Sequence, residues 1–350
     1  MAHIPMIRYI ADRLKEAETQ QEKQSILERY DSDTLFQRIL YYTYHPMIIF
    51  GLDDYQPKLP LEKEDGMGVS KFMHIPEDLA ENKLDSDEAR FACNLVFGHI
   101  NEYEAEIFLG MLKKDIGVGL EIDTINNVWN GLIPGYPVQK PTVYTNELSR
   151  GITFPAVAQP YIKGKRINII VKYNLVEFRD ENGNILNGFQ DYVKQFSDLA
   201  QNQSIVFDTV LIKNYDEIVD LDYSDDKLEI EYGKEHFVIF DVIRYDGFLK
   251  GLDNRILYNW RYNSIDHMTY LARDLNPSID YSIITSKVVK NWDEVNEALI
   301  ELGRDMVLKN LESVWMGGNN PEHLLLHKNP VTLETELSSE NTTVSTSTAS

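Results

Sequence analysis

The feature that most constrains the fold is an abrupt change of sequence pattern between residues 131 and 141. Pro134, Gly135, Pro137 and Pro141 fall within eight residues there, and clusters of Pro and Gly interrupt regular structure. Before this segment apolar residues recur at helical spacing, and after it the apolar runs are short, β-branched and aromatic. A chain of 350 residues is also about twice as long as a domain of roughly 150 residues. The sequence therefore predicts two domains joined near Pro134.

The first part of the chain, residues 1–133, has the pattern of an all-helical domain. Its segment 51–68 contains two prolines and several glycines, so we expect a loop there. Apolar residues at helical spacing, and polar residues able to cap a helix, predict helices elsewhere: at 6–30 with a polar break at 19–24, after Asp33 and Thr34, at 85–100, and at 102–114.

The second part, residues 134–330, has the pattern of a mainly antiparallel α+β domain. The Asn-Gly pair at 182–183 is a hairpin signal, which favours antiparallel pairing of the strands around it. Strands are predicted at 156–161, 166–173, 175–179, 204–212, 227–232 and 236–244, and helices at 190–201, 258–275 and 293–303. The Ser/Thr-rich stretch 331–350 lacks aromatic residues, so we expect a disordered tail or tether.

Composition limits the partners of this chain. It carries 34 Lys+Arg against 56 Asp+Glu, a formal net charge of -22, which disfavours duplex DNA as a partner and favours a protein. The densest basic cluster is Lys163, Lys165 and Arg166. One cysteine, Cys93, and no Cys/His cluster at metal-ligand spacing predict a reducing compartment without structural zinc. No apolar run approaches the roughly 18 residues of a membrane span, so we expect no membrane association and a cytoplasmic protein.

Several segments, in the same order along residues 1–330, resemble the ATP-dependent DNA ligases of tailed bacteriophages. They are KDIGVG at 114–119, INNVWNGLIP at 125–134, FPAVAQ at 154–159, HFVIFDVIR at 236–244, YNWRYNSIDHM around Arg261, and VLKN at 307–310. The resemblance implies a helical DNA-binding domain followed by an adenylation, or nucleotidyltransferase, domain. If the chain is phage-encoded, its location is the host cytoplasm, with virion association as a further option.

Members of this family join nicks through a lysine amine that attacks the α-phosphate of ATP and forms lysyl-AMP, with Mg²⁺ neutralising charge. The family motif is Lys-x-Asp-Gly-x-Arg. In the residues that follow FPAVAQ, Tyr161 stands where the family has its nucleophilic lysine, and Lys163 stands where it has the aspartate. Gly164 and Arg166 match the glycine and the arginine of the motif. A phenol, with a reference pKa near 10, is a poor substitute for the lysine amine. Lys163 could act as a displaced nucleophile if the strand slipped by two residues, because such a shift leaves each side chain on the same face of the strand.

Other motif positions are also altered relative to the family. The Asp-Gly-Glu strand reads Asp208-Thr209-Val210, the glutamate of the fourth motif falls on Arg304 or Asp305, and the fifth motif retains only its second lysine as Leu326-His327-Lys328. Because the sequence runs to residue 350, we also expect the family's OB-fold domain of roughly a hundred residues to be lacking.

The matching positions imply candidate nucleotide-binding residues, namely Gly164, Arg166, Asp208, Phe240, Lys309 and Lys328. Asp241 is a candidate metal ligand, although an Asp after an apolar strand is as often a cap or turn residue. Isolated lysines such as Lys309 and Lys328 are more often solvated. Phe237 and Phe240 could stack on adenine, but a position in the core is favoured. His327 is interpreted as a surface residue.

The altered motifs lead to one leading hypothesis and two alternatives. The leading hypothesis is a DNA-ligase-like pseudoenzyme that acts by binding, requires no cofactor, and uses ATP and Mg²⁺ only if activity is retained. The first alternative is an active ATP-dependent DNA ligase or nucleotidyltransferase with Lys163 as its nucleophile. The second is a structural or virion-associated scaffold.

Overall fold

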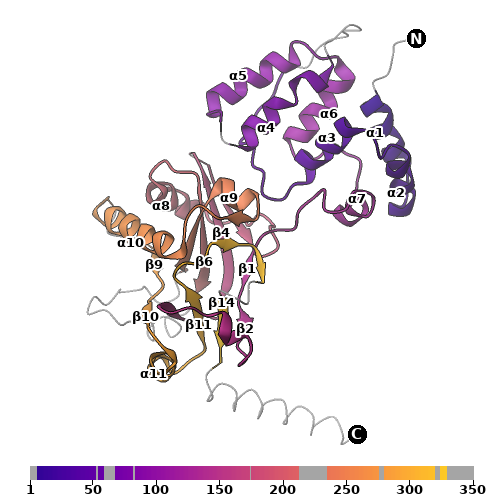
Figure 1. Ribbon diagram of the computed structural model, residues 1–350. Coiled ribbons are helices and arrows are strands. Elements are labelled where there is room, and N and C mark those ends of the chain that lie inside the picture. Colours follow the sequence, from indigo (N-terminus) through magenta and orange to yellow (C-terminus); the bar gives the residue numbers. More distant parts are fainter. Residues whose placement is uncertain are drawn as a thin grey trace, which may run out of the picture. The chain divides into compact units, whose positions relative to one another are not determined.

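The computed structural model describes residues 6–52, 54–58, 68–81, 83–173, 175–212, 235–275, 280–319 and 324–328, without the side chains of 269, 271–275 and 319. The predicted strand at 227–232 and the predicted tail at 331–350 lie outside the described residues. The chain divides into two compact units, residues 1–135 and 136–350, each of which is described by itself (Figure 1). As the sequence predicts, helices and sheets both contribute to the fold. No helix in the described part is long and apolar enough to cross a membrane.

The described residues of the first unit form helices and no strand. Apolar residues three or four apart, such as Ile7, Ile10 and Leu14 on α1, are buried, so the helices pack through one apolar face. The helices are α1 (Met6–Glu16), α2 (Gln20–Arg29), α3 (Thr34–Tyr44), the 3₁₀ turn η1 (Val69–Phe72), α4 (His74–Ala80), α5 (Ser86–Phe97), α6 (Glu102–Leu112) and α7 (Ile122–Val128).

The polar segment at 19–24, predicted as a break, is mostly the beginning of α2. The Thr19 hydroxyl accepts a hydrogen bond from the Glu22 N–H, and the Glu22 carboxylate accepts one from the Thr19 N–H. This reciprocal capping satisfies donors that a helix N-terminus leaves free, so polar residues here start a helix instead of ending one. Asp33 caps α3 as predicted, its side chain accepting from the Phe36 N–H.

Two five-stranded sheets organise the second unit. The first has the order β10-β3-β11-β14-β2 and the second β5-β4-β6-β7-β9. Their pairs are antiparallel except for β14–β2 and β7–β9. The strands are β2 (Thr142–Val143), β3 (Ala156–Pro160), β4 (Lys165–Lys172), β5 (Leu175–Asp180), β6 (Ile205–Ile212), β7 (His236–Arg244), β9 (Tyr281–Ile283), β10 (Lys287–Val289), β11 (Met306–Asn310) and β14 (Leu324–His327).

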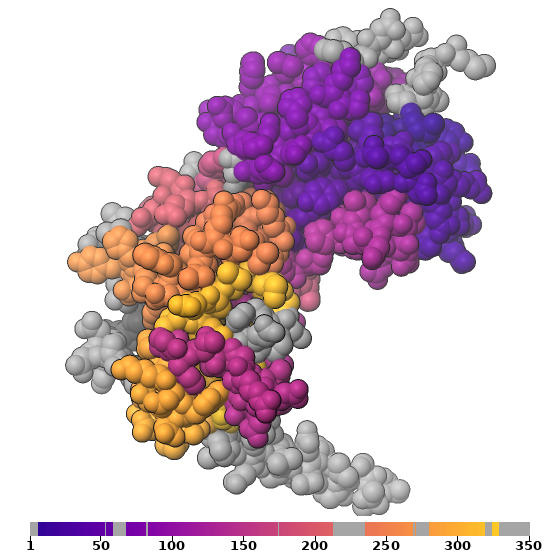
Figure 2. Space-filling model, viewed as in Figure 1, coloured from indigo at the N-terminus to yellow at the C-terminus, as the bar shows by residue number. Residues whose placement is uncertain are grey.

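Smaller elements complete the second unit. Segments far apart in sequence pair here: β1 runs beside β13, and β2 beside β14, so magenta and yellow surfaces adjoin in Figure 2. The remaining elements are β1 (Gln139–Lys140), η2 (Leu148–Gly151), α8 (Gln190–Ala200), α9 (Tyr245–Leu249), β8 (Leu252–Asp253), α10 (Tyr258–Leu275), α11 (Trp292–Leu302), β12 (Trp315–Met316) and β13 (Gly318–Asn319).

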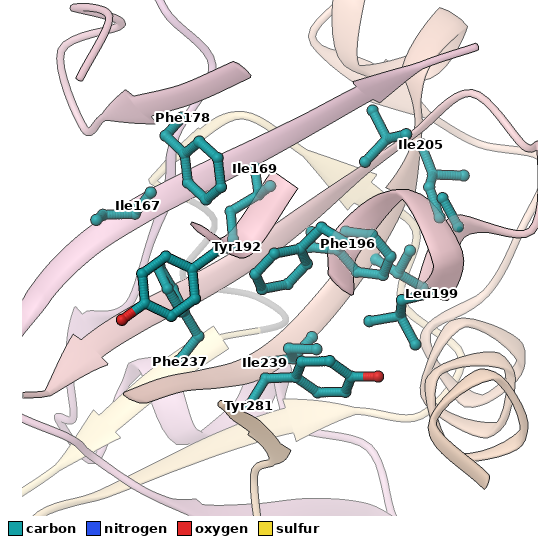
Figure 3. Close-up of a cluster of buried hydrophobic side chains, with 14 of the residues drawn as sticks. Ile167, Ile169, Phe178, Tyr192, Phe196, Leu199, Ile205, Phe237, Ile239 and Tyr281 are labelled. Atoms are coloured by element: carbon teal, nitrogen blue, oxygen red, sulfur yellow. The ribbon is translucent and has the colours of Figure 1, made fainter. Parts of the chain in front are cut away.

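An aromatic core fixes α8 against the second sheet (Figure 3). The ring of Phe237 on β7 lies 5.3 Å from that of Phe196 and 5.2 Å from that of Tyr192, measured between centroids. Phe237 is fully buried in this cluster. The sequence interpretation of Phe237 as a core residue is therefore confirmed.

The close packing at Gly164 gives a test of the arrangement of β4 against β6. A Cβ atom there would lie 2.5 Å from Val210 Cγ1 and 2.7 Å from the Leu211 carbonyl oxygen, whereas a Cβ at Gly135 would meet nothing within 4 Å. We expect Gly164→Ala to lower the free energy of unfolding by about 1–3 kcal/mol, because overpacking displaces the backbone. Gly135→Ala should change it by no more than about 0.5 kcal/mol. Urea denaturation measures the free energy of unfolding of both variants. Equal values for the two would contradict the close packing at Gly164.

Candidate functional site

The second unit contains a pocket of about 640 Å³ whose lining comes from both five-stranded sheets. Four of its lining side chains are cationic and two are carboxylates, in a chain with a net charge of -22. The cations are Lys140, Lys165, Arg166 and Lys309, and the carboxylates are Asp180 and Glu181. The pocket is therefore a locally basic site on an acidic protein.

A β-bulge on β7 directs Phe240 into this pocket. Asp208 on β6 is paired with Asp241, and the next residue of β6, Thr209, is paired with Ile239, so Phe240 is the extra residue of the bulge. Residues on either side of the bulge, Ile239 and Val242, both face the core although they are three positions apart. The bulge thus interrupts the alternation of side chains between the two faces of β7. Bulges commonly redirect side chains near functional sites.

Arg166 and Asp208 form a largely buried ion pair beside the pocket. The Arg166 Nε donates to Asp208 Oδ1 at 2.9 Å and Nη2 donates to Oδ2 at 2.5 Å, while Asn168 Nδ2 donates to Oδ1 at 2.9 Å. Burial lowers the pKa of the Arg166 guanidinium, but the Asp208 carboxylate more than compensates, so the pKa is raised. Both oxygens of Asp208 are occupied by protein donors.

Asp241 and Arg261 form a second buried ion pair. Arg261 Nε donates to Asp241 Oδ1 at 2.8 Å and Nη2 donates to Oδ2 at 3.1 Å, and the Val242 N–H also donates to Oδ1. Both side chains are almost fully buried. This environment does not fit the predicted metal-ligand role of Asp241, because a cation would compete with the guanidinium for the same oxygens.

The magnesium ion that a ligase-type site implies does not fit the donors of this pocket. Hard divalent cations need several free oxygen ligands, but Asp208 and Asp241 are each held by an arginine. Of the two carboxylates in the lining, Asp180 accepts a hydrogen bond from Asn184, and Glu181 lies 3.9 Å from the Lys140 ammonium group. At a third position where the family places an acid, the pocket is lined by the isopropyl group of Val210. Among the described residues, no group of three or more His, Cys, Asp or Glu side chains could hold a metal ion.

Lys309 on β11 lies at the wall of the pocket and is buried. Its Nζ donates to the Phe240 carbonyl oxygen at 3.3 Å and lies 5.2 Å from the Phe240 ring centroid and 4.5 Å from that of Tyr258. Burial lowers the pKa of Lys309 to about 8, against an opposing effect of Asp241. The interpretation of Lys309 as an isolated, solvated lysine is wrong.

Of the other predicted site residues, some line the pocket and some do not. Tyr161, which is 37% exposed, and Gly164 both line the pocket, whereas Lys163 is exposed and is not among its lining residues. Lys328 is also not part of the lining. His327 is half-buried and stacks on Tyr144 with ring centroids 4.4 Å apart, so its interpretation as a simple surface residue is wrong.

Sequence reasoning missed several residues that shape the site. Gln159 Nε2 donates to the Tyr258 hydroxyl at 2.7 Å and to Ser286 Oγ at 2.9 Å. Lys140 reaches the pocket from a two-residue strand, β1. Gln159 belongs to the recognised FPAVAQ segment and could have been found there, but nothing in the sequence around Lys140 indicates a functional role.

Comparison with known proteins relates this chain to phage DNA ligases. It is 27% identical over 174 residues to the DNA ligases of Enterobacteria phages T4 and T6, a match that covers 46% of this chain and 34% of each relative. The chain thus matches about a third of the length of these curated relatives. The predicted resemblance to phage DNA ligases is confirmed by this similarity. No protein-family model matches the chain.

Solved structures that a structural comparison matches to this chain include a protein named Pmar-Lig_PreS3, with a TM-score of 0.46 and 16% identity over 93% of this chain and 78% of that chain. Another is the ATP-dependent DNA ligase of bacteriophage T7 in complex with ATP, with a TM-score of 0.39 and 15% identity over 53% of this chain and 66% of that chain.

The Asp241–Arg261 pair predicts strong coupling between two substitutions. Arg261→Met alone should lower the free energy of unfolding by about 3–5 kcal/mol, because it leaves Asp241 buried without its partner. Adding Asp241→Leu should restore part of that loss, since no buried charge then remains. A double-mutant cycle by urea denaturation measures the coupling, and simple additivity of the two single effects would contradict the pairing.

The lowered pKa of Lys309 predicts a pH dependence of stability. Between pH 8 and 10.5 the unfolded chain keeps a proton on this lysine that the folded chain releases, so this residue makes the free energy of unfolding rise with pH across that window. The free energy of unfolding of Lys309→Met, relative to that of the unmodified protein, should therefore be highest near pH 7 and should fall by pH 10. Denaturation at both pH values checks this, with the exposed Lys194→Met as control. A constant difference would contradict a buried, titrating Lys309.

Proposed function

We propose that this chain, related in sequence to phage DNA ligases, acts by binding and does not seal nicks. One observation carries the proposal: Tyr161, which directly follows β3 and stands at the position expected for the attacking lysine, lines the pocket, while the nearby Lys163 lies outside it. A phenol does not supply the amine that forms lysyl-AMP. Because Lys163 does not line the pocket, it is poorly placed to replace the missing nucleophile.

The metal-binding positions support the same proposal. Transfer of a nucleotidyl group requires Mg²⁺ or an equivalent charge to stabilise the transferring phosphate. Here Val210 replaces one acid, and Arg166 occupies both oxygens of Asp208. The nucleophile position follows β3, and the acid position at Val210 lies on β6. A change in the alignment of one of these segments therefore does not remove both objections.

In this proposal the first unit is a ligase-type helical domain and the second a nucleotidyltransferase-like domain that retains its pocket without its chemistry. The partner we propose is a protein of a nucleic-acid-processing complex. The net charge of -22 supports a protein partner, because an acidic surface repels the phosphates of duplex DNA. The chain requires no cofactor for this role, and we place it in the cytoplasm.

The experiment that tests the proposal is incubation of the full chain with α-labelled ATP and Mg²⁺, followed by denaturing electrophoresis. We expect no labelled protein, since an attacking amine is missing from its place in the pocket. Lys163→Ala and Lys309→Ala variants are run beside it, with Lys194→Ala as the surface control and an active ATP-dependent ligase to show that the assay works.

A labelled band in the unmodified protein would overturn the proposal. If Lys163→Ala abolished that band, the chain would be an active nucleotidyltransferase with a displaced nucleophile. If Lys309→Ala abolished it and Lys163→Ala did not, mapping of the labelled peptide would decide whether the buried lysine is the nucleophile or only binds the nucleotide.

A further inference from the structure

Helix α5 of the first unit (Figure 1) carries two large apolar side chains that are exposed to solvent. Phe91 is 71% exposed and Leu95 is 44% exposed. They are four residues apart, so they lie on successive turns of one face of the helix. The opposite face of α5 packs into the unit through buried residues such as Cys93 and Val96. The apolar strip formed by Phe91 and Leu95 therefore plays no part in the core.

Single exposed apolar side chains are common on protein surfaces and need no special explanation. Ile300 on α11, which is 79% exposed, is of that kind. The strip on α5 differs because its two side chains are neighbours on one helix face, and apolar anchors four residues apart are typical of a helix that binds a partner. The strip is therefore a candidate docking surface.

Carboxylates lie next to the strip on the same face of α5. Asp87 and Glu88, both exposed, are four and three residues before Phe91, so they lie one turn from its ring. The Glu88 carboxylate accepts a hydrogen bond from the Asp85 N–H at 3.0 Å, which helps to begin the helix. The Asp87 carboxylate forms no ion pair with a described residue, so its charge is available to a partner.

The surroundings of the strip are also acidic. Residues 74–97, which hold α4 and α5, contain six Asp+Glu and two Lys+Arg. Both of these cations are already engaged: Lys83 lies 3.0 Å from each of two carboxylates, and Arg90 lies 2.5 Å from Asp54. The strip is thus an apolar surface bordered by net negative charge, which attracts cationic side chains and repels the phosphates of nucleic acid.

We propose that this face of α5 binds an amphipathic helix of a partner protein, whose apolar side is flanked by lysine or arginine residues. Phe91 and Leu95 pack against the apolar side of that helix and supply most of the binding energy. Asp87 and Glu88 face its cations, which fixes the orientation of the helix and speeds association. This inference rests on the proposed function, binding of a protein, and names the chemistry of the partner.

The probe is a fluorescently labelled helical peptide of about 15–20 residues, with leucines along one face and lysines elsewhere. Fluorescence anisotropy at physiological ionic strength measures its affinity for the full chain, and we expect saturable binding. Phe91→Ala combined with Leu95→Ala should weaken binding by about tenfold or more, because the buried apolar area is lost. Ile300→Ala, a matched change at an exposed apolar residue of the second unit, should leave the affinity unchanged.

Two further measurements separate the strip from general attraction between opposite charges. A peptide with the same lysines but serine in place of leucine should bind about tenfold more weakly or worse. Asp87→Asn should weaken binding of the leucine-lysine peptide by about two- to threefold and reduce its dependence on salt, because one interfacial charge is removed. Circular dichroism establishes that each variant is folded, and all the substituted residues are exposed.

Several results would overturn the inference. These are no binding of the leucine-lysine peptide, equal binding of the serine peptide, or equal affinity of the double alanine variant. Self-association of the full chain that the double variant abolishes would assign the strip to a second copy of the chain. Duplex DNA binding that the double variant abolishes would assign it to nucleic acid.

These outcomes are distinguishable from failure of the proposed function. Covalent labelling by ATP would refute the non-catalytic proposal whatever the peptide titration gives. Failure of the peptide to bind, in a chain that ATP does not label, would refute only the docking surface on α5.

Discussion

The second unit depends on two buried ion pairs, Arg166–Asp208 and Asp241–Arg261, on either side of the β-bulge at Phe240. Asp208 and Asp241 lie opposite each other on β6 and β7. Two neighbouring buried carboxylates repel each other unless each has a cation. The arginines supply those cations, and by doing so they remove both carboxylates from any metal. One arrangement of charge thus stabilises the sheet and limits the chemistry of the pocket beside it.

The lining of the pocket is basic, with four cationic side chains and two carboxylates. At its wall lies the ammonium group of Lys309, which contacts the rings of Phe240 and Tyr258. The lowered pKa of Lys309 reflects its burial, and it shows the energetic cost of keeping a charge there.

The secondary structure was largely predictable because it depends on local patterns. The strand at His236–Arg244 and the helix at Tyr258–Leu275 match their predicted ranges, and Asp33 caps its helix as expected. Short elements such as α4, α7 and β1 were missed, since a few residues carry no measurable periodicity. The prediction of a break at 19–24 was wrong because low hydropathy does not distinguish a helix break from a capping box such as the one at Thr19.

The sequence by itself determined the helical and α+β regions and the resemblance to phage DNA ligases, and it predicted Tyr161 at the position where the family has its lysine. Only the tertiary structure decided which charged side chains meet. Arg261 and Asp241 are 20 positions apart and Lys309 lies on a strand of the other sheet, so no local pattern could indicate that two of these charges are paired and the third is not. The physical reason is that ion pairing and burial depend on distances in space, which the folded sheets set and the order of residues along the chain does not.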